Sequence, residues 1–395
     1  MLKGKTVLLG VTGGIAAYKA AALASALVKL HACVEVIMTE HATEFIAPLT
    51  FEQLTGNRTM VNTFDRNFTH QVEHISLAQR TDLVIVAPAT ANVCAKLAYG
   101  LADDMLTTTV LACKCPKLIA PAMNTNMYEN PVTQDNLKIL EKYGWQVITP
   151  ASGRLACGAV GAGKLPEPEE LLQYILRTIA MDHDLEGKTI LVTAGATRES
   201  LDPVRYLTNH STGKMGCAIA EAAMLRGAKV ILVCGAVSAK IPPFVEVVKA
   251  VSAQEMFEAV AKYAKDADYI FKAAAVADYT PATYCDDKMK KKDGELSIEL
   301  KRTTDILAWL GQNRRDGQVI CGFSMETRDM VENSRAKLLK KNVDMICANN
   351  LKQEGAGFGV DTNIITLITK DDVQELPLQS KQQAAHAIID HAITL

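Results

Sequence analysis

The sequence predicts an α/β protein made of two doubly wound, three-layer (αβα) Rossmann-like domains with mainly parallel sheets. Continuous Val/Ile/Leu runs alternate with helix-like stretches, which is typical of parallel strands buried on both faces. The alternation starts again after a polar stretch at 181–187. Segments 82–92 and 268–278 also resemble each other at a constant offset, which indicates two buried strands of one fold class.

The individual elements follow from short apolar runs and turn signals. In the first half we expect strands at 5–11, 34–40, 82–90, 117–124 and 145–150, with a helix at 15–30. In the second half we expect a strand ending at 193–195, a helix beginning near 213–216, and strands at 228–235 and 268–280. This pattern predicts a first domain at 1–182, a linker at 183–188 and a second domain at 189–395.

Composition and charge limit the class of protein. The chain has 395 residues, 49% hydrophobic and 22% charged, which is ordinary for a globular protein of two domains. A net charge of −2 provides no basic field for nucleic acid. Gly13, Gly14 and Lys19 interrupt the first apolar run, which argues against a secretion signal or a membrane span. Ten irregularly spaced cysteines suit a reducing compartment, so we expect a cytoplasmic protein.

The turn in KTVLLGVTGGIAAYKA (5–20) is a candidate phosphate site. It reads Gly10-x-x-Gly13-Gly14 rather than GxGxxG, although Glu35 lies about 20 residues on, where a dinucleotide site has its ribose-binding acid. Backbone N–H groups at a helix N-terminus, with the Thr12 hydroxyl nearby, suit a single phosphate. The residues favour a mononucleotide such as FMN and leave open a tight turn that binds nothing.

Further candidates follow the other strands of the first half, where parallel sheets bind their ligands. They are Thr39 after the second strand, Pro88, Thr90 and Asn92 after the third, and Asn124 after the fourth. His74 lies in QVEHISL. A lone histidine or asparagine is more often a surface or core residue than a catalytic one, so these residues alone identify no reaction.

Five strings in the first half resemble the flavin-dependent cysteine decarboxylases, in particular the 4′-phosphopantothenoylcysteine decarboxylases. The strings are VTGGIAAYK, HISL, APATANVCAKLAYGLADDML, APAMNTNMYENP and GRLACGAVGAGKLPEP. The resemblance covers nearly all of 1–180 and implies bound FMN, with catalytic roles for His74, Asn124 and a flap cysteine, Cys157. The residues implied to contact FMN are Thr12, Gly13, Gly14, Ile15, Thr39, Pro88, Thr90 and Asn92.

The reaction that this resemblance implies begins with oxidation of the CH₂–SH carbon, for which the flavin accepts the electrons. The resulting thioaldehyde is an electron sink that lets the carboxylate leave as CO₂. We expect the Asn124 amide to donate to that carboxylate and His74 to accept the thiol proton. The Cys157 thiol is expected to protonate the enethiolate carbon during the final reduction.

The same flap carries GxxxxGK at 158–164, which is nearly a P-loop. Leu165 stands where the Mg²⁺-binding hydroxyl is required, and Pro166 disfavours a helical conformation at Leu165. We therefore interpret the segment as a glycine-rich flap. The decarboxylase family usually has Arg-Met where this chain has Lys164-Leu165, which leaves open which group the flap binds.

The second half begins with a different anion-binding pattern, in VTAGATRESLDPVRYLTNHSTGKMG (192–216). A loop carries Arg198, Arg205, Asn209 and His210 before Ser211-Thr212-Gly213-Lys214 opens a helix. Hydroxyls, glycine backbone and a helix N-terminus form an anion site, and an ordinary capped helix is the alternative. A run with Lys288, Lys290, Lys291 and Lys292 adds charge that a solvated surface explains equally well.

TRESLDPVRYLTNHSTGKMG, AAAVADY and FGVDTN closely resemble the phosphopantothenate–cysteine ligases. The resemblance implies CTP as co-substrate, catalytic roles for Arg205, Asn209 and Lys288, and Asp278 as a ligand of Mg²⁺ or of the ribose. The residues implied to contact CTP are Ser211, Gly213, Lys214, Ala275, Asp278, Lys288, Thr304, Asp305, Ile306, Leu307, Phe323, Lys337 and Lys341.

The ligase reaction implied by this resemblance has two steps. The carboxylate of 4′-phosphopantothenate attacks the α-phosphate of CTP, giving an acyl-cytidylate and pyrophosphate, and the cysteine amine then displaces CMP. Mg²⁺ and Lys288 are expected to screen charge in the first step. Asn209 is expected to bind the acyl-cytidylate, and Arg205 to position its anionic groups.

A decarboxylase half followed by a ligase half resembles the bacterial bifunctional enzymes of coenzyme A synthesis. This family implies decarboxylase trimers and ligase dimers, hence a homo-dodecamer with flavin sites between subunits. We expect small-molecule substrates, no nucleic acid and no membrane. Two alternatives from other classes are a nicotinamide-dependent reductase and a non-catalytic flavoprotein regulator.

Overall fold

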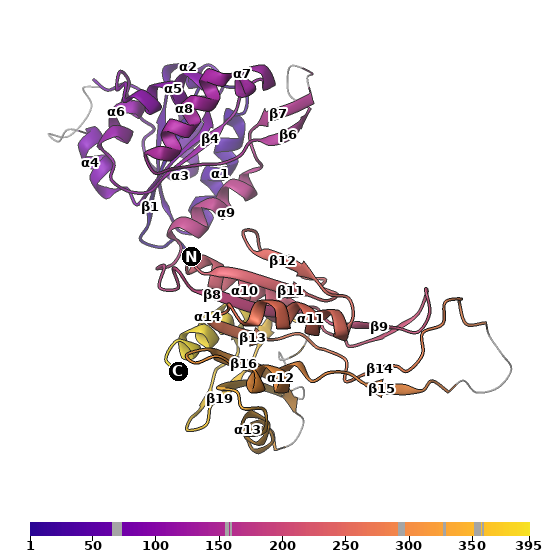
Figure 1. The fold of residues 1–395 in the computed structure, drawn as a ribbon. Helices are drawn as coiled ribbons and strands as arrows, with labels where there is room; N and C mark the ends of the chain where they lie inside the picture. Colours follow the sequence, from indigo (N-terminus) through magenta and orange to yellow (C-terminus); the bar gives the residue numbers. More distant parts are fainter. Residues whose placement is uncertain are drawn as a thin grey trace. The chain divides into compact units, whose positions relative to one another are not determined.

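The computed structural model describes residues 1–64, 73–154, 158, 160–290, 297–326, 329–350, 357 and 359–395. The chain divides into two compact units, Met1–Met181 and Asp182–Leu395 (Figure 1). Asp184 forms an ion pair with Arg226, and Leu185 is buried. This part of the predicted linker is therefore bound to the second unit.

In the described part of the first unit, five parallel strands form one sheet in the order β2-β1-β3-β4-β5. The strands are β1 (Thr6–Val11), β2 (Cys33–Met38), β3 (Leu83–Ala89), β4 (Lys117–Pro121) and β5 (Trp145–Val147). The order changes direction after β2, which confirms the predicted doubly wound class. The crevice at the carboxyl ends of β1 and β3 is the point where such sheets bind ligands.

Helices cover both faces of this sheet. They are α1 (Ala17–Lys29), α2 (Glu40–Thr43), α3 (Pro48–Thr55), α4 (Glu73–Arg80), α5 (Ala91–Tyr99), α6 (Met105–Ala112), α7 (Thr125–Glu129), α8 (Pro131–Lys142) and α9 (Pro168–Ile179). One face packs against α4, α5, α6 and α8, in a cluster that includes Leu8, Leu77 and Leu137. Helix α1 packs with α3 and α9 in the other layer, beside the buried Val7 and Leu9. A hairpin of β6 (Ala151–Arg154) and β7 (Val160–Lys164) precedes α9.

The described residues of the second unit form an eight-stranded sheet in the order β12-β11-β8-β13-β16-β17-β19-β20. The strands are β8 (Thr189–Ala194), β11 (Lys229–Cys234), β12 (Glu246–Lys249), β13 (Tyr269–Lys272), β16 (Val319–Glu326), β17 (Met345–Asn350), β19 (Thr366–Ile368) and β20 (Val373–Glu375). The pairings from β12 to β17 are parallel, and β19 and β20 are antiparallel additions at one edge. The sheet is mainly parallel, as predicted.

This second sheet also has helices on both faces. They are α10 (Lys214–Leu225), α11 (Ala253–Ala264), α12 (Ile306–Gln312), α13 (Met330–Lys341) and α14 (Lys381–Ala392). Helices α11, α12 and α13 share a buried cluster with Leu191 of β8. Helix α10 lies on the other face, because a Cβ atom on Gly216 would lie 2.6 Å from the Cβ of Ala194, and alternate strand residues point to opposite faces. Helix α14 packs on α10.

Short paired strands extend from this second unit. They are β9 (Arg198–Ser200) with β10 (Tyr206–Thr208), β14 (Tyr279–Pro281) with β15 (Leu300–Arg302), and β18 (Thr362–Asn363) with β21 (Gln379–Ser380). Figure 1 shows β9, β14 and β15 in an arm that projects away from the sheet of this unit.

The single strand predicted at 268–280 is wrong, because β13 ends at Lys272 and β14 begins at Tyr279. The intervening backbone leaves the sheet: the N–H of Ala274 donates to Thr193 Oγ1 at 3.1 Å, and that of Ala275 donates to Gly195 O at 2.8 Å. The chain thereby turns across the carboxyl end of β8. The apolar run from Ala273 onward lines a site instead of continuing the sheet.

Candidate active sites

Thr12 joins the ends of β1 and β3 in the first unit. Its buried hydroxyl donates to Pro88 O at 2.8 Å and accepts from the N–H of Thr90 at 3.0 Å. A Cβ atom on Gly13 would lie 2.6 Å from the Cβ of His41, so only glycine fits there. The Thr12 hydroxyl is therefore engaged within the protein and shapes the predicted phosphate turn.

The other predicted flavin-contacting residues lie around this turn. Gly14 and Ile15 precede α1, where Ile15 is exposed and no protein atom lies within 4 Å of a Cβ atom built on Gly14. Thr39 follows β2, and Thr90 caps α5 by accepting from the N–H of Val93 at 3.3 Å. Pro88 and Asn92 flank Thr90 at the end of β3. The N-termini of α1 and α5 thus meet at adjacent strand ends, and this set of donors fits a phosphate.

Glu35 does not serve this site. It lies inside β2 opposite Leu8, is 6% exposed, and pairs with Arg80 at 2.8 Å. A ribose-binding acid must stand at a strand end, so the position of Glu35 speaks against a dinucleotide site.

Asn124 lies beside the predicted flap. The N–H of Ala122 donates to Ala89 O at 2.9 Å, which joins the segments that follow β3 and β4. The N–H of Met123 donates to Gly163 O at 3.0 Å, which joins the β6–β7 hairpin to the same segment. Asn124 caps α7, with Oδ1 accepting from the N–H of Asn126 at 2.9 Å. Cys157 lies outside the described residues.

His74 is separated from these residues within one chain. It lies on α4, which packs on α6 and is tied to the edge strand β2 by the Arg80–Glu35 ion pair. Figure 1 shows α4 on the opposite side of the first unit from α7 and the β6–β7 hairpin. The structure therefore brings Thr90 and Asn124 together but leaves His74 apart.

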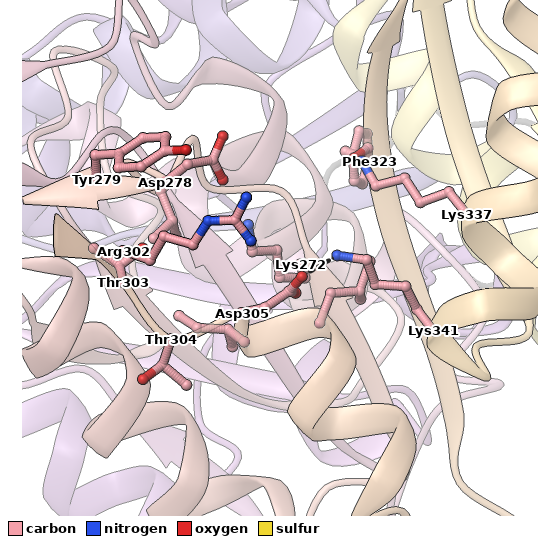
Figure 2. A pocket seen from close by; sticks show the side chains of 13 residues that line it. Lys272, Asp278, Tyr279, Arg302, Thr303, Thr304, Asp305, Phe323, Lys337 and Lys341 are labelled. Carbon is pink, nitrogen blue, oxygen red and sulfur yellow. Dashed lines mark hydrogen bonds and ion pairs between the residues drawn. The ribbon is translucent and has the colours of Figure 1, made fainter.

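A cavity of about 340 Å³ opens at the carboxyl ends of β13 and β16 in the second unit (Figure 2). Eight predicted CTP-contacting residues line it: Asp278, Thr304, Asp305, Ile306, Leu307, Phe323, Lys337 and Lys341. The sequence predictions missed the other lining residues: Lys272, Val276, Tyr279, Arg302 and Thr303. Figure 2 shows Lys337 and Lys341 reaching from one wall toward Arg302 and Asp278 on the other.

The charges of this cavity suit a polyanion. Burial, with Lys337 and Lys341 close by, lowers the pKa of Lys272 to about 8. Asp305 caps α12 and pairs with Lys341. Burial acts to raise the pKa of Asp305, but the hydrogen bonds from Lys341 and from the N–H of Ala308 outweigh it, so this pKa lies below its ordinary value. Four basic side chains of the lining face two carboxylates, so the cavity carries a net positive charge; they are Lys272, Arg302, Lys337 and Lys341 against Asp278 and Asp305.

The sequence around the missed residues explains why they were not predicted to line a site. Lys272 ends an apolar run, and the sequence pattern predicts a strand that continues beyond it. Arg302 and Thr303 lie in a charged stretch that resembles a solvated surface. Thr303 locks this stretch to the site, because its Oγ1 donates to Ala277 O at 2.6 Å and its N–H to Asp278 O at 3.0 Å. The predicted start of a helix at Asp305 was the signal in the sequence that could have placed Arg302 and Thr303 at the site, because they directly precede it.

The remaining predicted CTP-contacting residues except Lys288 line a second cavity of about 140 Å³, which shares Phe323 with the first. These are Ser211, Gly213, Lys214 and Ala275. Lys214 donates to Gly359 O at 2.8 Å and pairs with Asp361 at 2.7 Å. Asn209 donates from Nδ2 to Ala275 O at 3.1 Å, which brings it to the same edge of the sheet.

Arg205 and Lys288 lie in the projecting arm. Arg205 pairs with Asp202 at 2.6 Å and donates to Met289 O at 2.6 Å, next to Lys288. Neither residue lines either of the two cavities in the part of the chain that the structure describes. One chain therefore does not bring these two predicted catalytic residues to the nucleotide cavity.

The described residues contain neither a preformed metal centre nor a membrane-spanning helix. Among them, no three His, Cys, Asp or Glu side chains gather as a metal centre. Asp278 is an exposed carboxylate in the cavity, and one carboxylate together with substrate phosphates is a common way to hold Mg²⁺. No helix in the described ranges has the length and apolar character to cross a bilayer.

Comparison with known proteins identifies the family of both units. Residues 1–180 match the family model described as Flavoprotein, and 185–395 match the model described as DNA/pantothenate metabolism flavoprotein C-terminal domain. The chain is 49% identical over 399 residues to the coenzyme A biosynthesis bifunctional protein CoaBC of Bacillus subtilis (strain 168), covering 100% of this chain and 98% of that protein. The protein of the same name from Escherichia coli (strain K12) is 40% identical over 396 residues, with the same coverage. A crystal structure of the C-terminal domain of CoaBC is 44% identical, covers 52% of this chain and 94% of that chain, and has a TM-score of 0.45. The chain therefore belongs to the family of bifunctional coenzyme A biosynthesis proteins.

Proposed function

We propose that this chain catalyses two consecutive reactions of coenzyme A biosynthesis. Residues 189–395 join 4′-phosphopantothenate to cysteine with CTP, and residues 1–182 convert the 4′-phosphopantothenoylcysteine to 4′-phosphopantetheine and CO₂. The observation that carries the proposal is the cavity at the ends of β13 and β16. Lys272, Lys337 and Lys341 converge there and supply the positive charge that binding of a nucleoside triphosphate requires. The full-length family membership supports pairing this site with a flavin site.

In the ligase reaction, the cavity lysines bind the phosphates of CTP and offset the repulsion between CTP and the incoming carboxylate. Asp278 holds Mg²⁺ or the ribose, and Phe323 flanks the base. Asn209, held by Ala275 O, meets the acyl-cytidylate at the adjoining cavity. Arg205 and Lys288 position and screen its anionic groups.

In the decarboxylase reaction, the N-termini of α1 and α5 hold the FMN phosphate. Bound FMN supplies reversible two-electron oxidation of the substrate CH₂–SH carbon. Asn124 donates to the substrate carboxylate and orients it, His74 accepts the thiol proton, and the Cys157 thiol protonates carbon in the final step. The β6–β7 hairpin, attached at Gly163, covers the substrate and limits the access of water.

Each site is completed by a second copy of the chain. Helix α4, which carries His74, and helix α7, which Asn124 caps, lie on opposite sides of the first unit in Figure 1, so a flavin site that uses both residues takes them from two copies. The arm with Arg205 and Lys288 likewise reaches the nucleotide cavity of a second copy. Decarboxylase trimers and ligase dimers satisfy both requirements and close as a cytoplasmic dodecamer.

One assay tests both activities. Purified protein is mixed with CTP, Mg²⁺, cysteine and 4′-phosphopantothenate, and CMP and CO₂ are measured. We expect both products, together with the absorbance of bound flavin. Absence of CMP refutes the ligase, and CMP without CO₂ refutes the decarboxylase. Oxidation of NADH by a colourless protein favours a reductase, and bound flavin without either product favours a regulator.

A further inference from the structure

One buried lysine of the first unit connects the helix after the predicted phosphate turn to the base of the β6–β7 hairpin. Lys19 lies in the first turn of α1, shortly after Gly14, and is 5% exposed. Its Nζ donates to Leu165 O at 3.0 Å and pairs with Glu167 Oε1 at 2.8 Å. Both partners closely follow β7, which ends at Lys164. The Lys19 side chain therefore joins the beginning of α1 to the end of the hairpin.

The stability of α1 does not explain a lysine at this position. The partial positive charge at a helix N-terminus favours acidic side chains in the first turn, and the first turn of α1 contains none. Burial of an ammonium group is also unfavourable unless the group is paired and hydrogen-bonded. Both effects disfavour Lys19 in the helix itself, so its contacts with the end of the hairpin are what compensate for it.

Glu167 pairs with two lysines, and Lys19 is the stronger partner. Lys164 contacts the same carboxylate oxygen at 3.4 Å, and its side chain is 42% exposed. The hydrogen bond from Lys19 is the main cause that lowers the pKa of Glu167 below its ordinary value, so the carboxylate is ionised at neutral pH. The bond from Lys19 to Leu165 O is buried, and loss of a buried donor costs more free energy than loss of an exposed ion pair.

A second attachment holds the same strand of the hairpin. The N–H of Met123 donates to Gly163 O at 3.0 Å, and a Cβ atom on Gly161 would lie 2.7 Å from Thr125 Oγ1. Met123 and Thr125 are the neighbours of Asn124 in the chain. The end of β7 is therefore fixed on the segment of Asn124 and, two residues after Gly163, on helix α1.

We propose that Lys19 is a positioning residue of the decarboxylase, which holds the β6–β7 hairpin at the flavin site so that the enethiol stays bound until it is reduced. The inference rests on the proposed decarboxylase function. Lys19 belongs to the helix whose N-terminus is proposed to hold the FMN phosphate. The contact with Leu165 O thus fixes the hairpin relative to the element that binds the cofactor.

Loss of this attachment has a defined chemical consequence. Oxidation of the CH₂–SH carbon leaves two electrons on the enzyme, and loss of CO₂ gives the enethiol. When the enethiol stays bound, it takes up these two electrons and two protons and becomes 4′-phosphopantetheine. When it leaves first, the two electrons pass to dissolved O₂, which takes up two protons and becomes H₂O₂. CO₂ then exceeds 4′-phosphopantetheine, and H₂O₂ equals the difference.

The test compares Lys19→Met with Lys29→Met, which removes an exposed lysine from the last turn of the same helix. The full-length flavin-loaded proteins receive 4′-phosphopantothenoylcysteine in air, and CO₂, 4′-phosphopantetheine and H₂O₂ are measured. Because a buried hydrogen bond from a charged group is lost, we expect Lys19→Met to release about tenfold more enethiol per CO₂ than wild type. Lys29→Met should give the wild-type ratio.

Limited digestion with trypsin gives a second measurement that does not depend on catalysis. Arg154 is exposed and ends β6, so cleavage after it reports how often the hairpin opens. In Lys19→Met we expect this cleavage to be about tenfold faster, with unchanged flavin content per chain. Cleavage after Lys138, an exposed lysine of α8, should keep the wild-type rate.

Glu167→Gln removes the ion pair but keeps the bond from Lys19 to Leu165 O. The position is exposed, so this variant should fold, and we expect increases of about twofold to threefold in both measurements. The proposal is overturned if Lys19→Met leaves the product ratio and the cleavage after Arg154 unchanged. It is also overturned if Lys19→Met loses flavin without faster cleavage, because Lys19 then supports only the phosphate turn.

If Lys19→Met does not fold, wild-type behaviour of Glu167→Gln in both measurements overturns the proposal. A wild-type protein that releases no CO₂ refutes the decarboxylase function itself, whereas the trypsin comparison still tests the attachment of the hairpin.

Discussion

The backbones of Met123 and Gly163 are in direct contact: the N–H of Met123 donates to Gly163 O at 3.0 Å, and a Cβ atom on Gly163 would lie 2.3 Å from Met123 O. Gly163 also has φ of +121°, which side chains rarely adopt. This contact attaches the β6–β7 hairpin to the segment that carries Asn124.

Gly163→Ala is therefore expected to detach the hairpin and lower decarboxylase kcat/KM at least tenfold, while ligase activity stays near wild type. CO₂ release from 4′-phosphopantothenoylcysteine measures the first activity, and CMP release measures the second. Gly56→Ala is the matched control, because Gly56 also has positive φ (+73°) but has no atom within 4 Å of the added Cβ. Equal loss in both variants would show that conformational strain, not hairpin contact, is responsible.

Sharing of the flavin site between copies predicts complementation. His74→Ala and Asn124→Ala are each expected to abolish CO₂ release. When the two variant chains are co-expressed, some interfaces combine an intact His74 with an intact Asn124, so part of the activity returns. If mixed assemblies show no recovery, both residues must act from the same chain.

Cys157→Ser tests the role of the flap thiol. We expect this variant to release CO₂ but to stall before the final reduction, because a serine hydroxyl is a much weaker acid than a thiol. Product analysis should show the oxidised enethiol in place of 4′-phosphopantetheine. Normal 4′-phosphopantetheine at the wild-type rate would refute the assignment of Cys157.

The lowered pKa of Lys272 predicts that the stability of the protein depends on pH. Its folded pKa of about 8 lies below the ordinary value of 10.5, so the unfolded chain binds more protons between these values. Lys272 therefore lowers the free energy of unfolding below about pH 8, and this destabilisation disappears as the pH rises toward 10.5. Lys272→Met should unfold at a higher temperature than wild type at pH 7, with a smaller difference at pH 10.

The same Lys272→Met variant should have a raised KM for CTP at pH 7, because one positive charge is lost from the cavity. Lys370→Met, which removes an exposed lysine outside the cavity, is the control for both measurements. An unfolding difference that does not change with pH would contradict the assigned titration.

Asn209→Asp is expected to accumulate acyl-cytidylate without forming amide. The substitution replaces the NH₂ that donates to Ala275 O with an oxygen, so it should disturb the second step more than the first. Rapid quenching with labelled CTP separates the intermediate from CMP. Full amide formation at the wild-type rate would remove Asn209 from the mechanism.

Much of the nucleotide site was predictable because helix starts and strand ends are local signals. Asp305 is the N-cap of α12 and Phe323 ends an apolar run within β16, and both line the cavity. Lys272 was missed because its neighbours in sequence look like strand interior, and only the turn toward Gly195 exposes it to the cavity. The partners of Arg205 could not be predicted either, because Asp202 and the Met289 carbonyl come together only when the arm has folded.

The sequence by itself determined the fold class, since buried parallel strands appear as continuous apolar runs and each crossover needs a helix of recognisable period. Asp82 and Asp268, equivalent in the two similar segments, even accept hydrogen bonds from the first strand of their units, at Thr6 N (2.6 Å) and Thr189 N (2.9 Å). Only the tertiary structure decided which side chains share a cavity and which lie apart. Lys272 and Asp278 line one cavity, whereas His74 lies away from Asn124. Such distances depend on how the sheet orders its strands, and no local pattern in the chain encodes that order.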